Sequence, residues 1–166
     1  VLFCADDGSE IGAAHAGWRG LAAGVLEATL TQLETPPERL LAWLGPCIGA
    51  ASYEVGEEVR RAFMATDPAS AACFVATRPG HWLCDLCGLA RRRLETAGVT
   101  RIHGGGHDTL ADTRFYSYRR EGASSGRLAS VIWLDPSSRT PDQNKPDQNR
   151  PDQNTPDQNT PDQNSK

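Results

Sequence analysis

Apolar residues recur with two different periods along the chain, and the shorter period predicts strands. Four apolar runs have the length of buried strands: 1–5, 10–15, 40–44 and 99–102. The turn sequence Asp6-Asp7-Gly8-Ser9 separates the first two runs, which predicts a hairpin. A short strand is also predicted at 72–76, and alternation over 127–134 predicts a final strand. The pattern therefore predicts about six strands.

Three other stretches place apolar residues three or four positions apart, as one face of a helix does. They are 21–33, a stretch that begins at Ser52, and 86–97. Ser52 fits the N-cap of the second helix, and Gly98 fits the position just after the third. Strands and helices mixed in this order predict an α/β (α+β) fold with layered sheets and helices.

Residues 140–166 repeat Pro-Asp-Gln-Asn with one variable polar residue and contain no apolar side chain to bury. Such a segment cannot offset the entropy that it would lose on ordering, so it is predicted to be disordered. The expected organisation is one globular unit at 1–138 followed by a disordered repeat tail at 139–166.

Charge and hydropathy argue against two classes of partner. The formal net charge is −4, the isoelectric point is near 5.5 and no basic run stands out, so nucleic acid is not an expected partner. No apolar stretch reaches the roughly 18 residues of a membrane span, so no membrane association is expected. The first residues lack a starting Met and resemble the middle of a strand, so the chain is expected to be a fragment of a longer protein.

Five cysteines favour a reducing compartment, because their number is odd and a domain of this size needs no disulfide framework. The expected location is the cytoplasm. Cys84 and Cys87 form a CxxC pair at the start of a predicted helix. Because no second pair of this kind is present, buried small side chains are favoured over a metal site.

A glycine-rich segment carries His103, His107 and Asp108, a set able to chelate a metal. Its three glycines make it costly to order, so an active-site loop and a surface loop are equally good interpretations. The loop Gly45-Pro46-Cys47-Ile48-Gly49 either contacts a substrate or forms a tight structural turn.

The strongest functional signal is Ala14-His15-Ala16-Gly17-Trp18-Arg19-Gly20, which joins a predicted strand to a predicted helix. His15 and Arg19 stand beside the first free N–H groups of that helix, a place suited to metals and anions. A histidine at a strand end is also commonly a hydrogen-bonded structural residue, so both interpretations stay open from this stretch alone.

Together these segments resemble the YfiH-type laccase-domain family over residues 1 to about 134. The resemblance rests on several motifs in one order: His15-Ala16-Gly17-Trp18-Arg19-Gly20, Leu44-Gly45-Pro46 with Ile48-Gly49, Tyr53-Glu54-Val55-Gly56, Phe115-Tyr116-Ser117-Tyr118-Arg119-Arg120, and Gly126-Arg127 to Leu134. Members of the family are described as purine nucleoside phosphorylases and as polyphenol oxidases. The resemblance implies a layered α/β/β/α fold.

The resemblance also implies roles for four residues. His15 matches a histidine of the family's metal and catalytic cluster, so it is the expected ligand of zinc, or alternatively copper. Arg19 is the expected phosphate-binding catalytic residue, because a guanidinium binds phosphate oxygens bidentately. Tyr118 and Arg119 are expected to line the pocket for the base. The family's other histidine and its cysteine lie upstream of this chain, and Asp108 stands where the family usually carries a cysteine.

For the full-length protein the resemblance implies phosphorolysis of adenosine, inosine, guanosine and methylthioadenosine, with adenosine deamination. Purine nucleosides and phosphate are then the expected partners. Copper-dependent polyphenol oxidation is the first alternative, although four histidines are too few for a full multicopper cluster. The second alternative is an inactive fragment or a non-catalytic interaction domain.

Overall fold

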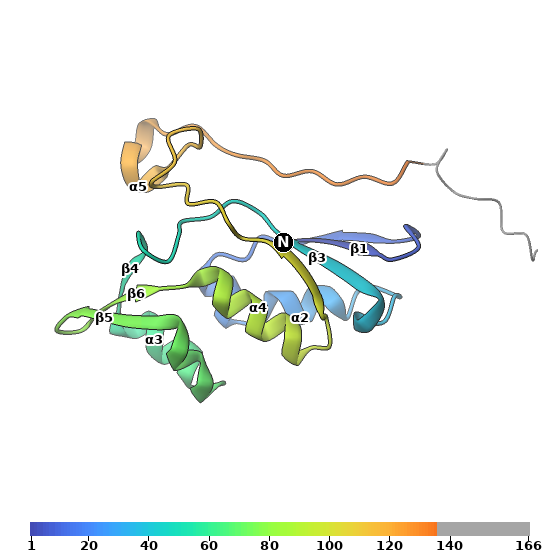
Figure 1. The fold of residues 1–166 in the computed structure, drawn as a ribbon, viewed down its shortest axis with the longest axis horizontal. Helices are drawn as coiled ribbons and strands as arrows, with labels where there is room; N and C mark the ends of the chain where they lie inside the picture. Colours follow the sequence, from blue (N-terminus) through green and yellow to red (C-terminus); the bar gives the residue numbers. More distant parts are fainter. Residues whose placement is uncertain (136–166) are drawn as a thin grey trace, which may run out of the picture.

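The computed structural model describes residues 1–135, in which seven strands form two sheets accompanied by helices (Figure 1). This arrangement confirms the α+β fold that the sequence predicts. The predicted repeat tail at 139–166, and the last residues of the predicted globular unit at 136–138, lie outside the described residues.

The larger sheet has four strands in the order β2-β1-β3-β7. Strand β1 (Leu2–Ala5) is antiparallel to both β2 (Ile11–Ala13) and β3 (Leu40–Leu44), whereas β3 and β7 (Arg101–Gly104) are parallel. The hairpin of β1 and β2 and the position of β3 agree with the sequence pattern. Strand β7 begins later than predicted, because Val99 is buried in the core instead of pairing in the sheet.

The smaller sheet has three antiparallel strands in the order β4-β6-β5. They are β4 (Glu54–Gly56), β6 (His81–Cys84) and β5 (Phe74–Arg78). The strand predicted at 72–76 therefore forms, shifted toward the C-terminus as β5. Figure 1 shows this sheet at the opposite end of the molecule from the β1–β2 turn.

One prediction near the smaller sheet is wrong. The helix predicted from Ser52 begins only at Glu57, because residues 54–56 pair with β6, and Ser52 is therefore not its N-cap. A partner strand distant in sequence decided where this helix begins, and local propensity carries no information about such a partner.

The single helix predicted at 21–33 is also wrong in its extent. Two short helices occupy this region, α1 (Trp18–Ala22) and α2 (Val25–Leu30). Gly24 lies between them with a φ of 88°, a left-handed conformation that interrupts the helix and that glycine adopts without a steric cost.

Two longer helices and four short helical segments are also present in the described chain. Helix α3 spans Glu57–Met64, and α4 spans Leu86–Thr96 and ends just before Gly98, as predicted. The short segments are η1 (Pro37–Arg39), η2 (Pro68–Cys73), α5 (Tyr118–Glu121) and η3 (Gly122–Ser124).

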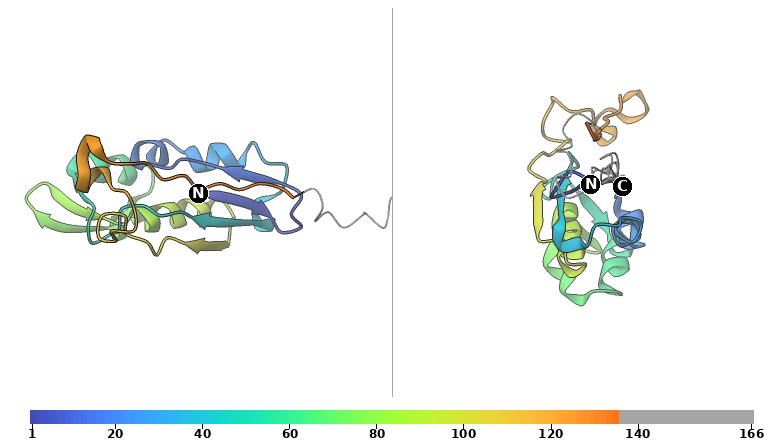
Figure 2. Two further views of the ribbon diagram at one scale, coloured as in Figure 1. Left: turned by 90° about the horizontal axis from the view of Figure 1, so that it is seen from above. Right: turned by 90° about the vertical axis from the view of Figure 1, so that its right-hand side faces the viewer.

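The final strand predicted at 127–134 does not form. This segment runs extended along the side of the larger sheet away from α2 and α4, as the orange trace in Figures 1 and 2 shows. Val131 and Trp133 are each 75% exposed, so the alternating pattern does not correspond to a buried face. Without a hydrogen-bonded neighbouring strand, an apolar alternation does not produce a sheet ladder.

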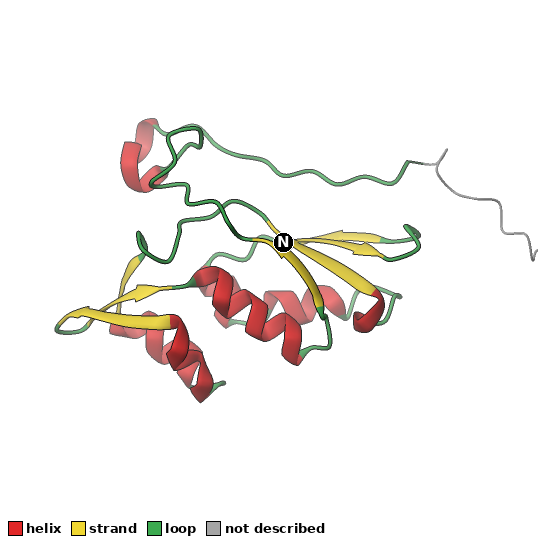
Figure 3. Cartoon of the chain, in the orientation of Figure 1, coloured by secondary structure: helices red, strands yellow, loops and turns green. Residues whose placement is uncertain are grey.

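The core lies between the larger sheet and the helices drawn in red beneath it in Figure 3. Alternate residues of β1 and β3 point toward the helices, as the period of a strand requires. The buried residues of these two strands are Phe3, Ala5, Leu40, Ala42 and Leu44. Those of the helices include Leu21, Leu26, Val59, Phe63, Leu89 and Leu94. This packing holds the ends of β1 and β3 in place, where the main cavity opens.

Candidate functional site

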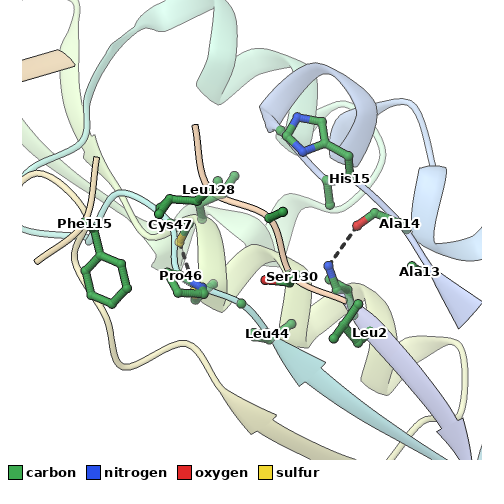
Figure 4. Close-up of a pocket in the computed structure, with 18 residues that line it drawn as sticks. Leu2, Ala13, Ala14, His15, Leu44, Pro46, Cys47, Phe115, Leu128 and Ser130 are labelled. Atoms are coloured by element: carbon green, nitrogen blue, oxygen red, sulfur yellow. Dashed lines mark hydrogen bonds between the residues drawn. The ribbon is translucent and has the colours of Figure 1, made fainter. Parts of the chain in front are cut away.

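A cavity of about 610 Å³ opens at the end of β3 beside the loop between β2 and α1 (Figure 4). Its wall includes the apolar side chains of Leu44, Pro46, Phe115 and Leu128. His15 also lines the cavity, and Figure 4 places Phe115 and His15 on opposite sides of it. The cavity therefore combines an apolar wall with one titratable ring.

His15 is held at this cavity by its backbone and leaves its side chain accessible. The backbone nitrogen of Val1 donates to the carbonyl of Ala14 at 2.8 Å, which extends the β1–β2 pairing to the residue before His15. A Cβ added to Gly17 would lie 3.4 Å from Nε2 of His15, so a small residue here leaves room for the ring. Within residues 1–135 the exposed ring makes no hydrogen bond, which leaves both ring nitrogens available to a ligand.

A second cavity, of about 350 Å³, contains both Arg19 and Arg119. The guanidinium carbon of Arg119 lies 5.2 Å from the centre of the Tyr53 ring, and that of Arg19 lies 4.5 Å from the centre of the Trp18 ring. Neither arginine forms an ion pair with a carboxylate in the described chain, although Glu58 also lines the cavity. Arg119 donates to the carbonyl of Glu54 at 3.4 Å. Two guanidinium groups without a carboxylate partner in one cavity are suited to binding an anion.

The structure thus divides the predicted site between two cavities. His15 lines the larger one, whereas Arg19 and Arg119 line the smaller one. Tyr118 lines neither of them and is 66% exposed.

Arg120 has a structural role, since its guanidinium donates to three backbone carbonyls of the preceding loop. Helix α1 has only five residues, so the anion preference expected of its N-terminus is small.

Asp108 connects two loops next to the larger cavity. Its carboxylate accepts hydrogen bonds from the Ser52 hydroxyl at 2.5 Å and from the backbone N–H of Leu110 at 2.9 Å. Burial raises the pKa of Asp108, but these bonds and others from the N–H groups of Gly49 and Ala111 lower it by more, so the pKa lies below its usual range. The ionised carboxylate is therefore a structural acceptor.

The two histidines of the glycine-rich segment do not join Asp108 in a metal site. The ring of His107 packs against Phe115 with 5.3 Å between ring centres, and His103 is exposed at the end of β7. Across residues 1–135, no group of three His, Cys, Asp or Glu side chains is placed to hold a metal ion. The described residues offer His15 as a single ligand and do not complete a metal site.

The CxxC cysteines do not act as a pair. Cys84 is fully buried in the core, where burial raises the pKa of its thiol to about 12. Cys87 lines the larger cavity and contacts Cys47 instead, with 3.3 Å between their sulfur atoms. No local sequence pattern marks Cys87 and Leu128 as cavity residues, because such a pattern carries no information about contacts between distant segments. The His15 motif and the Gly-Pro-Cys loop are the sequence signals that point to this cavity.

We expect Asp108→Asn to lower the free energy of unfolding by about 1–2 kcal/mol at pH 7, because an amide cannot accept all of the carboxylate's hydrogen bonds. The pKa of Asp108 is lower in the folded protein than in the unfolded chain, where an aspartate has a pKa of about 3.9. The ionised carboxylate therefore stabilises the fold above about pH 3.9, and this contribution is lost as the pH falls through the folded pKa. The difference in the free energy of unfolding between wild type and Asp108→Asn should therefore become smaller below about pH 4.

Urea denaturation at pH 7 and at successively lower pH values would measure this difference. Glu95→Gln, at an exposed position of α4, is the matched control and is expected to change the free energy of unfolding by less than about 0.5 kcal/mol. A difference for Asp108→Asn that stays constant with pH would contradict the assigned role.

Residues 1–135 match the family described as multi-copper polyphenol oxidoreductase laccase. The chain belongs to this family. The YfiH-type laccase-domain resemblance seen in the sequence is thereby confirmed.

The chain is also similar to proteins named purine nucleoside phosphorylase. It is 54% identical over 136 residues to the one from Pseudomonas aeruginosa, a match that covers 81% of this chain and 56% of that protein. It is 51% identical over 135 residues to purine nucleoside phosphorylase YfiH of Escherichia coli K12, a match that covers 81% and 55%.

Among solved structures, the chain is similar to protein NMB0706 of Neisseria meningitidis, with a TM-score of 0.72 and 46% identity over 74% of this chain and 51% of that one. It is also similar to YlmD of Geobacillus stearothermophilus, with a TM-score of 0.65 and 31% identity over 72% and 47%. The chain therefore spans about half the length of the relatives that it matches.

Proposed function

We propose that the intact protein is a purine nucleoside phosphorylase acting on adenosine, inosine, guanosine and methylthioadenosine, and that it also deaminates adenosine. The names of its relatives at about 50% identity support this class of enzyme. One structural observation carries the proposal: His15, with an unbonded ring, lies on the wall of a largely apolar cavity of about 610 Å³. Cavities of this size and lining typically hold ligands as large as a nucleoside.

In this proposal His15 acts on the purine. Phosphorolysis forms a bond between a phosphate oxygen and the anomeric carbon of the sugar, while the bond from that carbon to the purine nitrogen breaks. The departing purine needs a proton, and an imidazolium can supply it near neutral pH. The apolar side chains of Leu44, Phe115 and Leu128 would hold the base and exclude water.

Arg19 would bind the phosphate, and Arg119, which the resemblance assigns to the pocket for the base, would bind it as well because it lines the same cavity as Arg19. Both guanidinium groups are free of carboxylate partners within the described chain, and they share one cavity. The segment from His15 to Arg19 is five residues long and reaches from one cavity to the other, so the two cavities can supply two parts of one site. Tyr118 as a residue of the base pocket stays a prediction.

The alternative to this general-acid role, in which the ring carries no metal, is that His15 binds zinc, or copper, in the intact protein. The described residues do not complete such a site, so the remaining ligands would come from the part of its relatives' length that this chain does not cover. A bound zinc ion would supply Lewis acidity or an activated water, which suits deamination. The cytoplasmic location stays a prediction, and no helix within residues 1–135 is long and apolar enough to cross a membrane.

Copper-dependent phenol oxidation is the second candidate, and the description of the family is the observation that favours it. A non-catalytic fragment is the third. To separate them, we would join the uncovered part of the Pseudomonas aeruginosa relative to this chain and assay both the chimera and the 166-residue chain. We expect hypoxanthine release from inosine in phosphate buffer by the chimera, and none by the chain alone.

In the chimera, Arg19→Ala is expected to raise the KM for phosphate by about 10–100-fold, because a charged hydrogen bond contributes about 1.5–3 kcal/mol. The KM for inosine should change little. Arg39→Ala is the control, because Arg39 lies in a surface ion pair with Asp6 and Asp7 at the β1–β2 turn, and it should alter neither KM.

A chimera that is inert toward nucleosides but oxidises phenols with copper would replace the phosphorylase proposal with the oxidase proposal. If the chain alone releases hypoxanthine and His15→Ala abolishes it, the site is complete within these residues.

A further inference from the structure

Two cysteines that are 40 positions apart in sequence meet at the wall of the larger cavity. The sulfur atoms of Cys47 and Cys87 are 3.3 Å apart. Both side chains are half-buried, and both line a third cavity, of about 250 Å³, as well as the larger cavity. Figure 4 shows the Cys47 sulfur close to Pro46 and Leu128. The pair is therefore accessible to small molecules from two sides, and it plays no part in the phosphorolysis proposed above.

The surroundings hold both sulfur atoms in place. The backbone carbonyl of Cys47 accepts a hydrogen bond from the N–H of Thr109 at 2.9 Å, which fixes the loop that follows β3. Cys87 lies in the first turn of α4, where the Asp85 carboxylate accepts from the N–H of Gly88 at 2.8 Å. A disulfide bond is about 2.05 Å long, so forming one requires an approach of only about 1 Å from the present 3.3 Å.

The two sulfurs differ in their chemistry. Cys87 is at the N-terminal end of an eleven-residue helix, which favours a thiolate there. The contact with the Cys47 sulfur lowers the pKa of Cys87, and the positive charge of Arg91 acts in the same direction, while burial and the Asp85 carboxylate act against them. The same contact, together with burial, raises the pKa of Cys47. One sulfur is thus prepared as a nucleophile, and its neighbour stands within reach as a second thiol.

We propose that Cys47 and Cys87 are a redox modification site that forms a reversible disulfide with hydrogen peroxide as the oxidant. The Cys87 thiolate attacks one peroxide oxygen, the O–O bond breaks, and the other oxygen leaves as hydroxide and takes up a proton to become water. The Cys47 sulfur then attacks the resulting sulfenic acid. The S–O bond breaks, an S–S bond forms, and the hydroxide that leaves takes the proton of Cys47 as a second water. The two sulfurs lose two electrons in total, which reduce one peroxide.

The disulfide would connect the loop after β3 to the first turn of α4 and would replace two thiols at the cavity wall with one group that cannot ionise. Because reduction by a dithiol restores both thiols, the change is reversible. The proposal concerns covalent chemistry of this chain and does not depend on the proposed enzymatic activity.

The test treats the reduced 166-residue chain with hydrogen peroxide, blocks remaining thiols with an alkylating reagent, and measures the intact mass and the peptide map. We expect a loss of 2 Da before alkylation, loss of two of the five free thiols, and one crosslinked peptide pair containing Cys47 and Cys87. Dithiothreitol should restore all five thiols.

Cys47→Ser should prevent the crosslink and leave Cys87 as a sulfenic acid that dimedone traps. Cys4→Ser and Cys73→Ser, at other half-buried cysteines, are matched controls that should retain the crosslink. Wild-type protein that keeps five alkylatable thiols, or a crosslink through Cys73 or Cys84 instead, would overturn the proposal. The wild-type peptide map decides the question even if a serine variant fails to fold.

Discussion

Replacing His15 with alanine is expected to lower kcat/KM for inosine phosphorolysis by about 10³-fold, within the range of about 10²–10⁴ for loss of a general acid. The ring is exposed and makes no hydrogen bond within the described chain, so its removal should cost no packing. The measurement is hypoxanthine release by the chimera described above, together with a urea denaturation curve for the same variant.

His103→Ala is the matched control, since His103 is another exposed histidine and does not line the larger cavity. It should retain activity within about twofold, and neither variant should change the free energy of unfolding by more than about 0.5 kcal/mol. Full activity of His15→Ala would remove His15 from the mechanism. Loss of activity together with loss of folding would point to a structural role.

The largest effect on stability is expected for Phe63→Ala, which should lower the free energy of unfolding by about 3–5 kcal/mol. Phe63 is 1% exposed in α3, and its ring centre lies 6.2 Å from that of Phe74 in β5. The guanidinium carbon of Arg93 in α4 lies 5.8 Å from the same ring. The substitution therefore leaves a cavity where a helix, the smaller sheet and a second helix meet.

Urea denaturation followed by circular dichroism would measure this loss. Val75→Ala is the control, because Val75 follows Phe74 in β5 but is 63% exposed. It should change the free energy of unfolding by less than about 0.5 kcal/mol. Equal effects of the two substitutions would show that the Phe63 contacts do not form part of the core.

The loop that carries His15 could be predicted from the sequence, because its motif belongs to the family and joins a strand to a helix. His15, Arg19 and Arg119 were predicted to form one site, and the structure distributes them over two cavities. Their separation depends on the smaller sheet, whose strand β4 lines the same cavity as Arg19. That sheet includes β4, whose residues showed only a helical pattern in the sequence.

The sequence by itself determined those strands and helices that bury one face against the hydrophobic core. Strands β1 and β3 alternate buried and more exposed residues, α4 ends just before its glycine, and local periodicity reports such faces directly. Only the tertiary structure decided which distant segments meet. Pairing of β4 with β6, and the contact of Cys47 with Cys87, join residues 25 to 40 positions apart. Contacts at this separation depend on the packing of the whole chain, because each segment alone lacks the partner that selects its conformation.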